Sequence, residues 1–542
     1  MNKPIYVLGS GLSHDGSACL MKNGKIIVGI EKERLTKIKH DGFNDNDAIR
    51  YCLNAAGITF KDVDLFVEKY TVNEKHKPDD VIKRRGRIIP EYLPIVRIGH
   101  HIAHAYSAVG TSPFSESAVI VCDGMGGSID SCLDHDIRLV PSDIAKLSKS
   151  DYIDYFEKES YYKFFNNNVI PVFKDYSRFN FNDLNRYKIA PYDIEHSIGG
   201  LYGGASKFVF GNDFNEGKLM GLAPYGKSGR FSGELFLMKD ARVKINYDLI
   251  ENLGLKDTNI KDNFQYCADL AKWVQEQTEE ALFYLLNEYY EMYSSDNLCY
   301  AGGLALNAVA NGKITQNTPF KNVYIQPAAG DNGLAIGACY YGWMKVLNKE
   351  KVPFNGNPYF GIKYDTSESS LCKYLDDNYV ITKPGNLEEV VAKHISEGKV
   401  VGCFRKGSEF GPRALGNRSI LADLLYLLNG FILSFYPELS QRSIDFIHDA
   451  YIIVLVTIVI KSLSTINIVG ALRSGGDNRF IIIIDMVAAW FFGIPVCYIV
   501  LFYTDLPLFL AFAAPMVEDM VKAVLSTFRV IGEKWQRTIN VS

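Results

Sequence analysis

The chain has 542 residues, which is more than one ordinary domain holds and predicts roughly two to four domains. With 47% hydrophobic and 22% charged residues, its composition is that of a globular protein able to bury a large core, which excludes a wholly disordered, collagen-like or disulfide-stapled chain. The net charge of −4 gives no bulk attraction to nucleic acid, so no nucleic-acid partner is expected.

Short β-rich runs alternate with longer helical patterns from residue 1 to about 350. Strands are expected at Ile5–Leu8, Ile26–Ile30, Leu65–Val67, Ala118–Cys122, Leu298–Tyr300 and Val323–Ile325. Helices are expected at Asp47–Ala56, Tyr266–Tyr293 and Gly333–Val346. This alternation favours an α/β fold in which helices cover the sheets. Residues 130–195 are rich in Asp, Lys, Tyr and Asn, which is typical of a lid or an insertion.

Turn-forming residues in VPFNGNPYFGIKYD, at 352–365, predict a linker. Beyond it we expect a helix at Leu387–Glu397 and a strand at Val400–Phe404. The ten cysteines are scattered without a C-x-x-C pair, which indicates reduced thiols in a cytoplasmic protein. The N-terminus has no long apolar run, so no secretory signal is expected, and no repeat with a period of about 20–50 residues is found.

The last 119 residues, from 424 on, differ from the rest because they hold only 17 charged residues. Residues 450–460 and 486–504 contain no charge, and the second run is long enough to cross a bilayer at about 20 residues. Its Trp490 and Tyr498 favour a membrane segment over a buried core helix. Membrane contact is therefore expected within 450–525, and the mean hydropathy of −0.03 averages over two unlike parts.

Three of the ten histidines fall within GHHIAHAYSA at 99–108. On a helix, His100 and His104 share a face, and two imidazoles on one face suit a divalent cation. Asp123 and Asp331 each follow a predicted strand and are well placed to converge with them. A core or capping role is commoner for a single histidine, but the clustering favours a metal site.

Two glycine-rich turns suggest contact with a phosphate or a nucleotide. His14 and Asp15 lie in the turn GSGLSHDGSA, where a histidine can act as a base. Gly302, Gly303 and Asn307 follow a predicted strand, where a plain strand–helix connection is nearly as good an explanation.

The loop FRKGSEFGPRALGNRSILAD, at 404–423, has four cationic residues among three glycines. Arginine forks on such a backbone suit a phosphate or carboxylate better than they suit a solvated surface. An anion site is therefore expected there.

Seven motifs occur in order: GSGLSHDGSA, HHIAHAYSA, VIVCDG, GKLMGLAPYG, AGGLALNAVAN, QPAAGDNG and EFGPRALGNRSILAD. Together they resemble the carbamoyltransferases of the NodU and TobZ type, over about residues 1–423. The resemblance implies an ASKHA (actin/Hsp70/ribonuclease-H-like) two-lobed domain at 1–355, a linker at 356–383 and a YrdC-like α/β fragment at 384–423. It also implies that ATP and carbamoyl phosphate give carbamoyl adenylate, from which the carbamoyl group passes to a hydroxyl of a small molecule or sugar.

The resemblance assigns roles to particular residues. The ligands of an iron or zinc ion would be His100, His104, Asp123 and Asp331. His14 would be a base at the carbamoyl-adenylate site, with Lys218 and Glu216 in the same cleft. The nucleotide would contact Gly302, Gly303 and Asn307, and the carbamoyl-phosphate and ATP site of the second domain would hold Arg413, Asn417, Arg418 and Ser419.

Two departures from the family pattern stand out. The sequence has KGSE at 406–409 where the family has G-R-x-E, and the resemblance stops after Asp423. The second domain is therefore expected to be truncated and the making of carbamoyl adenylate impaired. The tail, 424–542, resembles the end of a multidrug and toxic compound extrusion (MATE) transporter through INIVGALRSGGDNRFIIIIDMVAAWFFGIPVCYIV and FRVIGEKWQRTIN.

The sequence thus predicts a cytoplasmic O-carbamoyltransferase joined to a helical tail that tethers it to a membrane. An ATPase or sugar kinase of the same superfold is the alternative within enzymes, since these share the glycine-rich loops without needing the histidine pair. A transporter-derived protein or a nonfunctional fusion of two genes is the alternative outside them. The acceptor and the oligomeric state stay open.

Overall fold

The computed structural model describes residues 3–42, 44–69, 86, 88–178, 188–190, 197–256, 258–363, 382–405, 407–421, 478–503 and 516–531. The chain divides into two compact units, Met1–Leu375 with Phe404–Ser419, and Asp376–Cys403 with Ile420–Ser542. The predicted fragment 384–423 is thus shared between them. The uncharged run 450–460, and residues 466–477 and 532–540 of the motifs that resemble a MATE transporter, lie outside the described residues.

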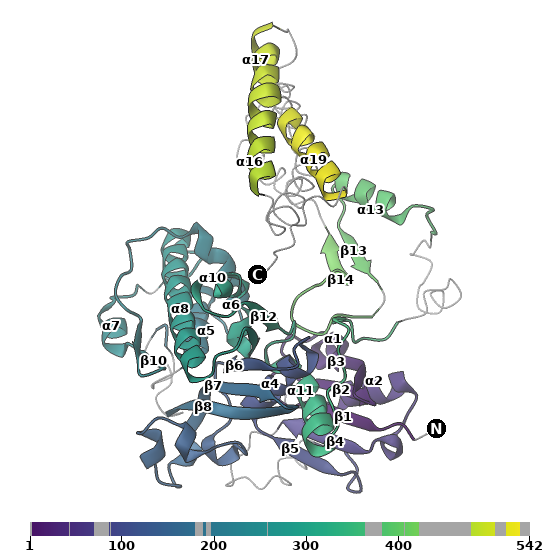
Figure 1. The fold of residues 1–542 in the computed structure, drawn as a ribbon, viewed down its shortest axis with the longest axis vertical. Helices are drawn as coiled ribbons and strands as arrows, with labels where there is room; N and C mark the ends of the chain where they lie inside the picture. Colours follow the sequence, from purple (N-terminus) through teal and green to yellow (C-terminus); the bar gives the residue numbers. More distant parts are fainter. Residues whose placement is uncertain are drawn as a thin grey trace, which may run out of the picture. The chain divides into compact units, whose positions relative to one another are not determined.

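The first sheet of the large unit has the strand order β3-β2-β1-β4-β5 (Figure 1). Its strands are β1 (Tyr6–Gly11), β2 (Ser17–Lys22), β3 (Lys25–Glu31), β4 (Leu65–Lys69) and β5 (Ile95–Ile98). The first three form an antiparallel meander, whereas β4 and β5 run parallel to β1. The carboxyl ends of three parallel strands therefore meet at one edge of this sheet.

The second sheet has the order β12-β11-β6-β7-β8. Its strands are β6 (Ser117–Cys122), β7 (Tyr155–Phe165), β8 (Asn168–Arg178), β11 (Asn297–Ala301) and β12 (Asn322–Ile325). Again the first three are antiparallel and the last two run parallel to the first. The two sheets therefore share one topology. The first copy runs over residues 6–111 and the second over residues 117–340, so neither corresponds to a repeat period of 20–50 residues.

Two helices occupy equivalent places in the two halves and pack against each other. Helix α4 (His100–Thr111) follows β5, and α11 (Leu334–Tyr340) follows β12 through the short turn η8 (Asp331–Gly333). The two helix backbones approach so closely that a side chain at position 337, which is glycine, would collide with the carbonyl oxygen of Ala103. One hydrophobic core cluster contains both helices together with strands of both sheets.

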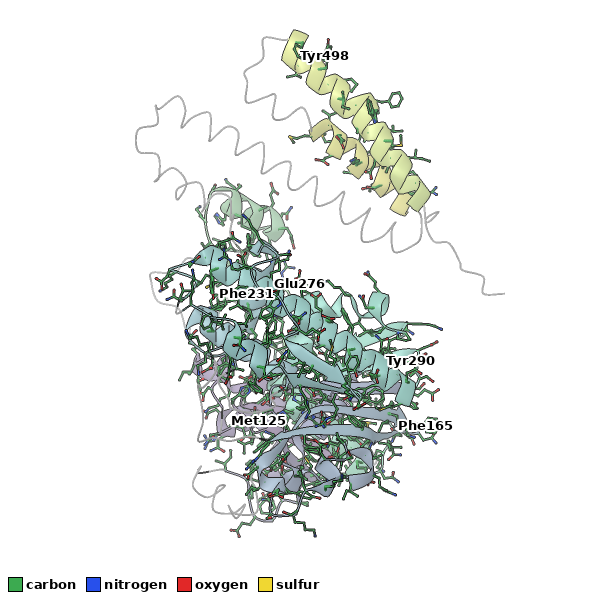
Figure 2. The ribbon with its side chains drawn as sticks, turned by 90° about the vertical axis from the view of Figure 1, so that its left-hand side faces the viewer. Met125, Phe165, Phe231, Glu276, Tyr290 and Tyr498 are labelled. Carbon is green, nitrogen blue, oxygen red and sulfur yellow. The ribbon has the colours of Figure 1, made fainter. Side chains whose placement is uncertain are left out.

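The outer faces of the sheets carry further helices. Helix α2 (Asn46–Ala56) contacts β2 and β3, and the long α8 (Phe264–Met292) belongs to the core of the second sheet (Figure 2). Among the described residues, this unit also contains α1 (Lys32–Thr36), α5 (Ile198–Phe210), α6 (Glu216–Leu222), β9 (Phe236–Lys239), β10 (Arg242–Ile245), α7 (Tyr247–Asn252), α9 (Ala308–Asn311), α10 (Ile314–Asn317) and the helical turn η9 (Tyr341–Val346). The predicted strands and helices are all present, and the α/β class is confirmed.

The prediction of a lid or insertion at 130–195 is wrong for its middle part, because β7 and β8 are integral strands of the second sheet. Their charged residues are buried in pairs. Lys174 Nζ lies 2.5 Å from Glu157 and 2.7 Å from Asp134, and Lys158 Nζ lies 3.0 Å from Asp175. A sequence rich in Lys and Asp resembles a surface, but here each buried charge has a partner of opposite sign.

The described part of the second unit is small. It contains α13 (Leu387–Ser396), the consecutive helical segments α16 (Asn478–Val487), η11 (Ala488–Gly493) and α17 (Ile494–Tyr503), and α19 (Met516–Ile531). Strands β13 (Val401–Phe404) and β14 (Arg418–Leu421) pair with each other where the chain passes between the units. The helix and the strand predicted near 387 and 400 are confirmed.

We expect Glu159→Gln to stabilise the protein at pH 8 but not at pH 4.5. Burial raises the pKa of Glu159 to about 7, against the attraction of Lys158. The Glu159 carboxyl thus binds its proton more tightly in the folded state than in the unfolded state. Its contribution to the free energy of unfolding is therefore lost as the pH rises through about 7. The variant should gain about 3 kcal/mol at pH 8.

The measurement is urea unfolding at both pH values, with the exposed Glu276→Gln as the matched control. An equal change at both pH values would show that Glu159 does not titrate as described.

Candidate functional site

Helix α4 carries two imidazoles near its N-terminus, four residues apart and therefore on the same face. His100 and His104 are 2% and 0% exposed, and their Nε2 atoms lie 3.1 Å apart. The Nδ1 atom of each ring has no hydrogen-bond partner among the described residues. Both rings thus direct the nitrogen Nε2 to one shared point.

Two carboxylates meet these imidazoles from the ends of strands β6 and β12. Asp123 Oδ2 lies 2.8 Å from His100 Nε2 and 3.6 Å from His104 Nε2. Asp331 Oδ1 lies 3.1 and 3.4 Å from the same two atoms. The structure therefore brings together the four residues that the sequence singled out, and all four are buried.

The charges in this cluster do not balance without a cation or protons. Burial opposes ionisation, but hydrogen bonds with His100 and His104 hold the pKa of Asp123 well below its usual range. Burial favours the neutral imidazole of His104, yet hydrogen bonds to Asp123 and Asp331 raise its pKa to about 9. Two carboxylates thus draw positive charge into the cluster.

The spacing of the donor atoms fits one small divalent cation. Four ligands held about 2.0–2.1 Å from a tetrahedral ion lie about 3.3 Å apart. The five distances given above span 2.8–3.6 Å. Two imidazole nitrogens and two carboxylate oxygens are also a donor set that zinc and iron accept.

His14 lies beside this cluster in the turn after β1. Its Nε2 is 3.4 Å from Asp331 Oδ2, and its Nδ1 is 3.4 Å from Asp15 Oδ2. Burial favours the neutral imidazole, but the charges of Asp331 and Asp15 raise the pKa of His14 to about 9. One nitrogen thus faces the cluster and the other faces an orienting carboxylate, as a general base requires.

Asp15 is shared by two histidines, and the second one is part of an aromatic stack. His40 Nδ1 lies 2.7 Å from Asp15 Oδ1, and the His40 ring stacks on Phe214 at 4.2 Å between centroids. Phe214 also contacts the His14 ring, at 5.0 Å. Both His40 and Phe214 have positive φ, of 53° and 64°, a strained conformation for such residues.

The other two residues predicted for this cleft lie on α6. Burial raises the pKa of Glu216, which lies near enough to His40 and His14 for their charges to oppose that shift. Lys218 is exposed, and its Nζ lies 5.8 Å from the Phe210 ring. The structure thus places Glu216 near the imidazoles, whereas Lys218 makes its described contact elsewhere.

The predicted nucleotide residues make internal contacts. The backbone N–H of Gly303 donates to Asp123 Oδ1 at 2.9 Å, so it orients a member of the four-residue cluster. Gly302 has φ of 96° and lies against the Cys122 carbonyl, where any Cβ would collide. Asn307 caps α9 and bonds Gln275 in the buried core.

The basic loop at 404–419 belongs to the large unit. Glu409 Oε1 accepts the backbone N–H groups of Leu415, Asn417 and Arg418, at 2.7–3.0 Å. Arg418 packs its guanidinium 4.7 Å from the Phe404 ring. Arg413 is exposed, with its guanidinium beside Gly217 of α6, and Ser419 is half-buried.

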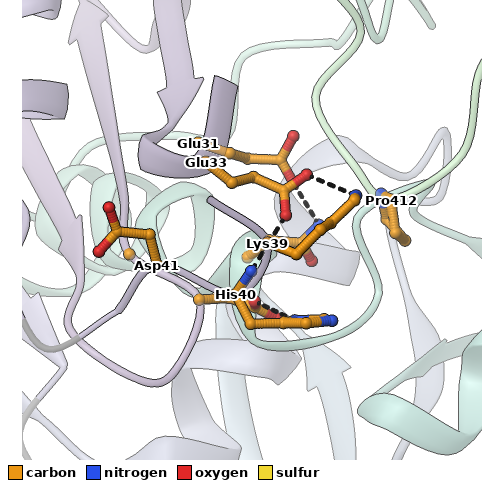
Figure 3. Close-up of a pocket in the computed structure, with 9 residues that line it drawn as sticks. Glu31, Glu33, Lys39, His40, Asp41 and Pro412 are labelled. Atoms are coloured by element: carbon orange, nitrogen blue, oxygen red, sulfur yellow. Dashed lines mark hydrogen bonds and ion pairs between the residues drawn. The ribbon is translucent and has the colours of Figure 1, made fainter. Parts of the chain in front are cut away.

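A small cavity of about 40 Å³ separates this loop from His40 (Figure 3). It is lined by Asp15, Gly16, Glu31, Glu33, Lys39, His40, Asp41, Asn332 and Pro412. Sequence reasoning assigned no role to Asp15, Glu31, His40, Phe214 or Glu409. Only Asp15 had a signal, since it directly follows His14.

Comparison with known proteins gives a consistent family. The model "Carbamoyltransferase N-terminus" matches residues 7–92 and 80–340, and "Carbamoyltransferase C-terminus" matches residues 392–426. The chain is 29% identical to the uncharacterized protein sll1178 of Synechocystis, over 77% of this chain and 71% of that protein. It is 28% identical to nodulation protein NolNO of Sinorhizobium fredii, over 76% of this chain and 58% of that protein.

Among solved structures, the chain is similar to HypF of T. kodakarensis, with a TM-score of 0.41 and 14% identity. That match covers 63% of this chain and 49% of HypF.

We expect the protein to bind one Co²⁺ per chain, with the intense visible absorption of a four-coordinate site. His104→Ala should weaken Co²⁺ binding at least 100-fold, because it removes one of four ligands. Titration followed by absorbance measures this, with His394→Ala as control, since the His394 side chain is 44% exposed and belongs to α13. Unchanged affinity in His104→Ala would contradict the four-donor site.

Proposed function

The chain belongs to the carbamoyltransferase family of enzymes, and we propose that it transfers a carbamoyl group from carbamoyl adenylate to a hydroxyl of a small molecule or sugar. The observation that carries the proposal is the arrangement in which His14 faces the four-donor cluster through one nitrogen and Asp15 through the other. Acyl transfer to a hydroxyl needs a base at the hydroxyl and positive charge at the carbonyl oxygen, and this arrangement supplies residues for both.

The residues of the cluster would hold an iron or zinc ion, which when bound would polarise the carbamoyl carbonyl. His14 would take the proton of the acceptor hydroxyl, whose oxygen then bonds to the carbamoyl carbon as AMP leaves. The bound ion would partly neutralise the charge of Asp331. The pKa of His14, which that charge raises, would then fall, so that the imidazole can accept a proton. Asp15 keeps the imidazole oriented throughout.

The acceptor would enter past the stack of His40 and Phe214, which borders His14. Phe214 is 46% exposed, so its ring offers an apolar surface at the entrance. Glu216 lies nearby and can accept hydrogen bonds from further hydroxyl groups. An acceptor with both a flat apolar face and several hydroxyls fits this combination best.

The donor would be made from ATP and carbamoyl phosphate at the basic loop. Arg413 supports this proposal because its exposed guanidinium is free to bind phosphate beside α6. The C-terminal family model matches only residues 392–426, although the chain continues to 542. We therefore propose that this first step is impaired, whereas the transfer step is retained.

The tail would tether the enzyme to a membrane rather than transport a solute. Among the described residues, Ile483–Val500 is long and apolar enough to cross a membrane, with a mean hydropathy of 2.0 and only 18% of it buried. The helical run from Asn478 to Tyr503 is about 39 Å long at 1.5 Å a residue, against about 30 Å of hydrocarbon. Transporters are built from repeats of several membrane-spanning helices, whereas the described residues contain one such helix.

The transfer step is tested with carbamoyl adenylate made separately, carrying a ¹⁴C carbamoyl group, and a panel of free sugars. We expect label to pass to a sugar with release of AMP. Asp15→Asn should slow this about 10- to 100-fold, since the amide cannot accept from both imidazoles. The exposed Asp47→Asn is the control. Transfer at the wild-type rate by Asp15→Asn would refute the orienting role.

The first step is tested by replacing the adenylate with ATP and carbamoyl phosphate. We expect pyrophosphate release at the background rate, because the C-terminal family model matches only residues 392–426. Robust pyrophosphate release that depends on carbamoyl phosphate would overturn the proposed impairment.

Membrane attachment is tested by fractionating cells that express the whole chain. We expect the protein to stay with membranes in 1 M NaCl and at pH 11, and to be released by detergent. Release by salt alone would contradict an integral helix.

A further inference from the structure

A single buried carboxylate stands between the basic loop and the four-donor cluster. Glu31, the last residue of β3, is only 4% exposed. Its Oε1 accepts from Asn332 Nδ2 at 2.6 Å, and its Oε2 accepts from Arg34 Nε at 3.1 Å. Each oxygen thus serves a different part of the chain.

The Asn332 side of this contact leads to the cluster. Asn332 follows Asp331 directly, in the turn η8, and is 5% exposed. Its carbonyl oxygen accepts from Ser17 Oγ at 2.9 Å. Two residues of the first sheet therefore hold the turn that carries Asp331. Glu31 binds the side-chain amide of Asn332, and Ser17 binds its backbone carbonyl.

The Arg34 side leads to the loop. Arg34 Nη2 donates to the Gly411 carbonyl at 2.7 Å, while its Nε is bound to Glu31. Gly411 has φ of 130°, and a side chain there would press on the Pro327 carbonyl, just before the Asp331 turn. Residues 407–411 are buried, so the loop is anchored at this point although Arg413 beyond it is exposed.

The neighbouring cavity offers no rival explanation for these contacts. Its volume of about 40 Å³ holds little more than one water molecule. Its acidic residues already have basic partners, since Glu33 lies 3.0 Å from Lys39 (Figure 3) and Asp41 lies 2.6 Å from Lys32. The charged groups here bind one another.

We propose that Glu31 and Arg34 are positioning residues that couple segment 407–411 to the turn carrying Asp331. The proposal rests on the cation site of the proposed function. Occupancy of the four-donor cluster fixes Asp331, and with it Asn332, Glu31 and Arg34, so it also orders the loop. Because coupling between two sites is reciprocal, a loop freed from Arg34 must weaken cation binding by the same factor.

The test uses the full chain, with Zn²⁺ alone as the ligand. Hydrogen exchange by mass spectrometry follows peptides that cover 404–419, and competition with a chromophoric chelator gives the Zn²⁺ affinity. In the wild type we expect Zn²⁺ to slow exchange in this segment about fivefold or more. In Arg34→Met that protection should vanish, and Zn²⁺ affinity should fall about fivefold or more.

Two further variants separate coupling from general damage. Glu31→Gln keeps an oxygen for Asn332 but loses the charge that holds Arg34, so it should behave as Arg34→Met does. Arg50→Met removes an arginine that lies 3.5 Å from Asp47 on the exposed side of α2, and it should match the wild type. Thermal unfolding of each variant establishes that the fold is intact.

An Arg34→Met protein that frees the loop yet binds Zn²⁺ as the wild type does would overturn the proposal. So would a wild type whose loop exchange is indifferent to Zn²⁺, or one that binds no Zn²⁺ at all. A wild type that binds Zn²⁺ with the expected coupling but transfers no carbamoyl group would refute the proposed function and leave the coupling standing.

Discussion

The close packing of α4 against α11 is the constraint on which the rest of the large unit depends. Both helices lie in the core between the two sheets, and Gly337 lets their backbones approach at Ala103. The histidines stand on the first turn of α4, and Asp331 stands just before α11. Bringing these helix starts together therefore assembles three of the four donors, while β6 delivers Asp123 from its carboxyl end. A bulkier residue at position 337 would separate the donors without touching any of them.

The duplicated topology explains the position of the four-donor cluster. In each half, the carboxyl ends of the parallel strands lie at one edge of the sheet, and the last of these strands is followed by one buried helix, α4 or α11. His14, Asp15 and the two histidines of α4 come from the first half, whereas Asp123 and Asp331 come from the second. No one half holds a complete site, which agrees with the two-lobed domain expected from the sequence. The likeness lies in strand order rather than in residue pattern, so a search for repeated residues passes it by.

Much of the fold and the four donors could be predicted from the sequence, because apolar strands, long helices and clustered histidines leave local patterns. The strands at 155–178 could not, because Lys158, Lys174 and Glu157 look like surface residues until their partners are known. Glu31 and Phe214 were missed for a related reason. Their partners, Asn332 and His40, are distant in the chain, and only the folded structure brings them into contact. Where a side chain's role depends on a remote partner, single-sequence patterns carry no trace of it.

The hydrogen bond from Gly303 to Asp123 has a consequence for the choice of metal. It occupies Oδ1, and Asp331 directs its own second oxygen to His14, so each carboxylate offers one oxygen to the cluster. Calcium, which takes six to eight oxygen ligands and often both oxygens of a carboxylate, finds too few here. Magnesium, which demands a near-ideal octahedron of oxygens, meets two nitrogens instead. A cation held at the proposed site would therefore meet two imidazole nitrogens and one oxygen from each carboxylate, a donor set that suits a four-coordinate transition metal better than calcium or magnesium.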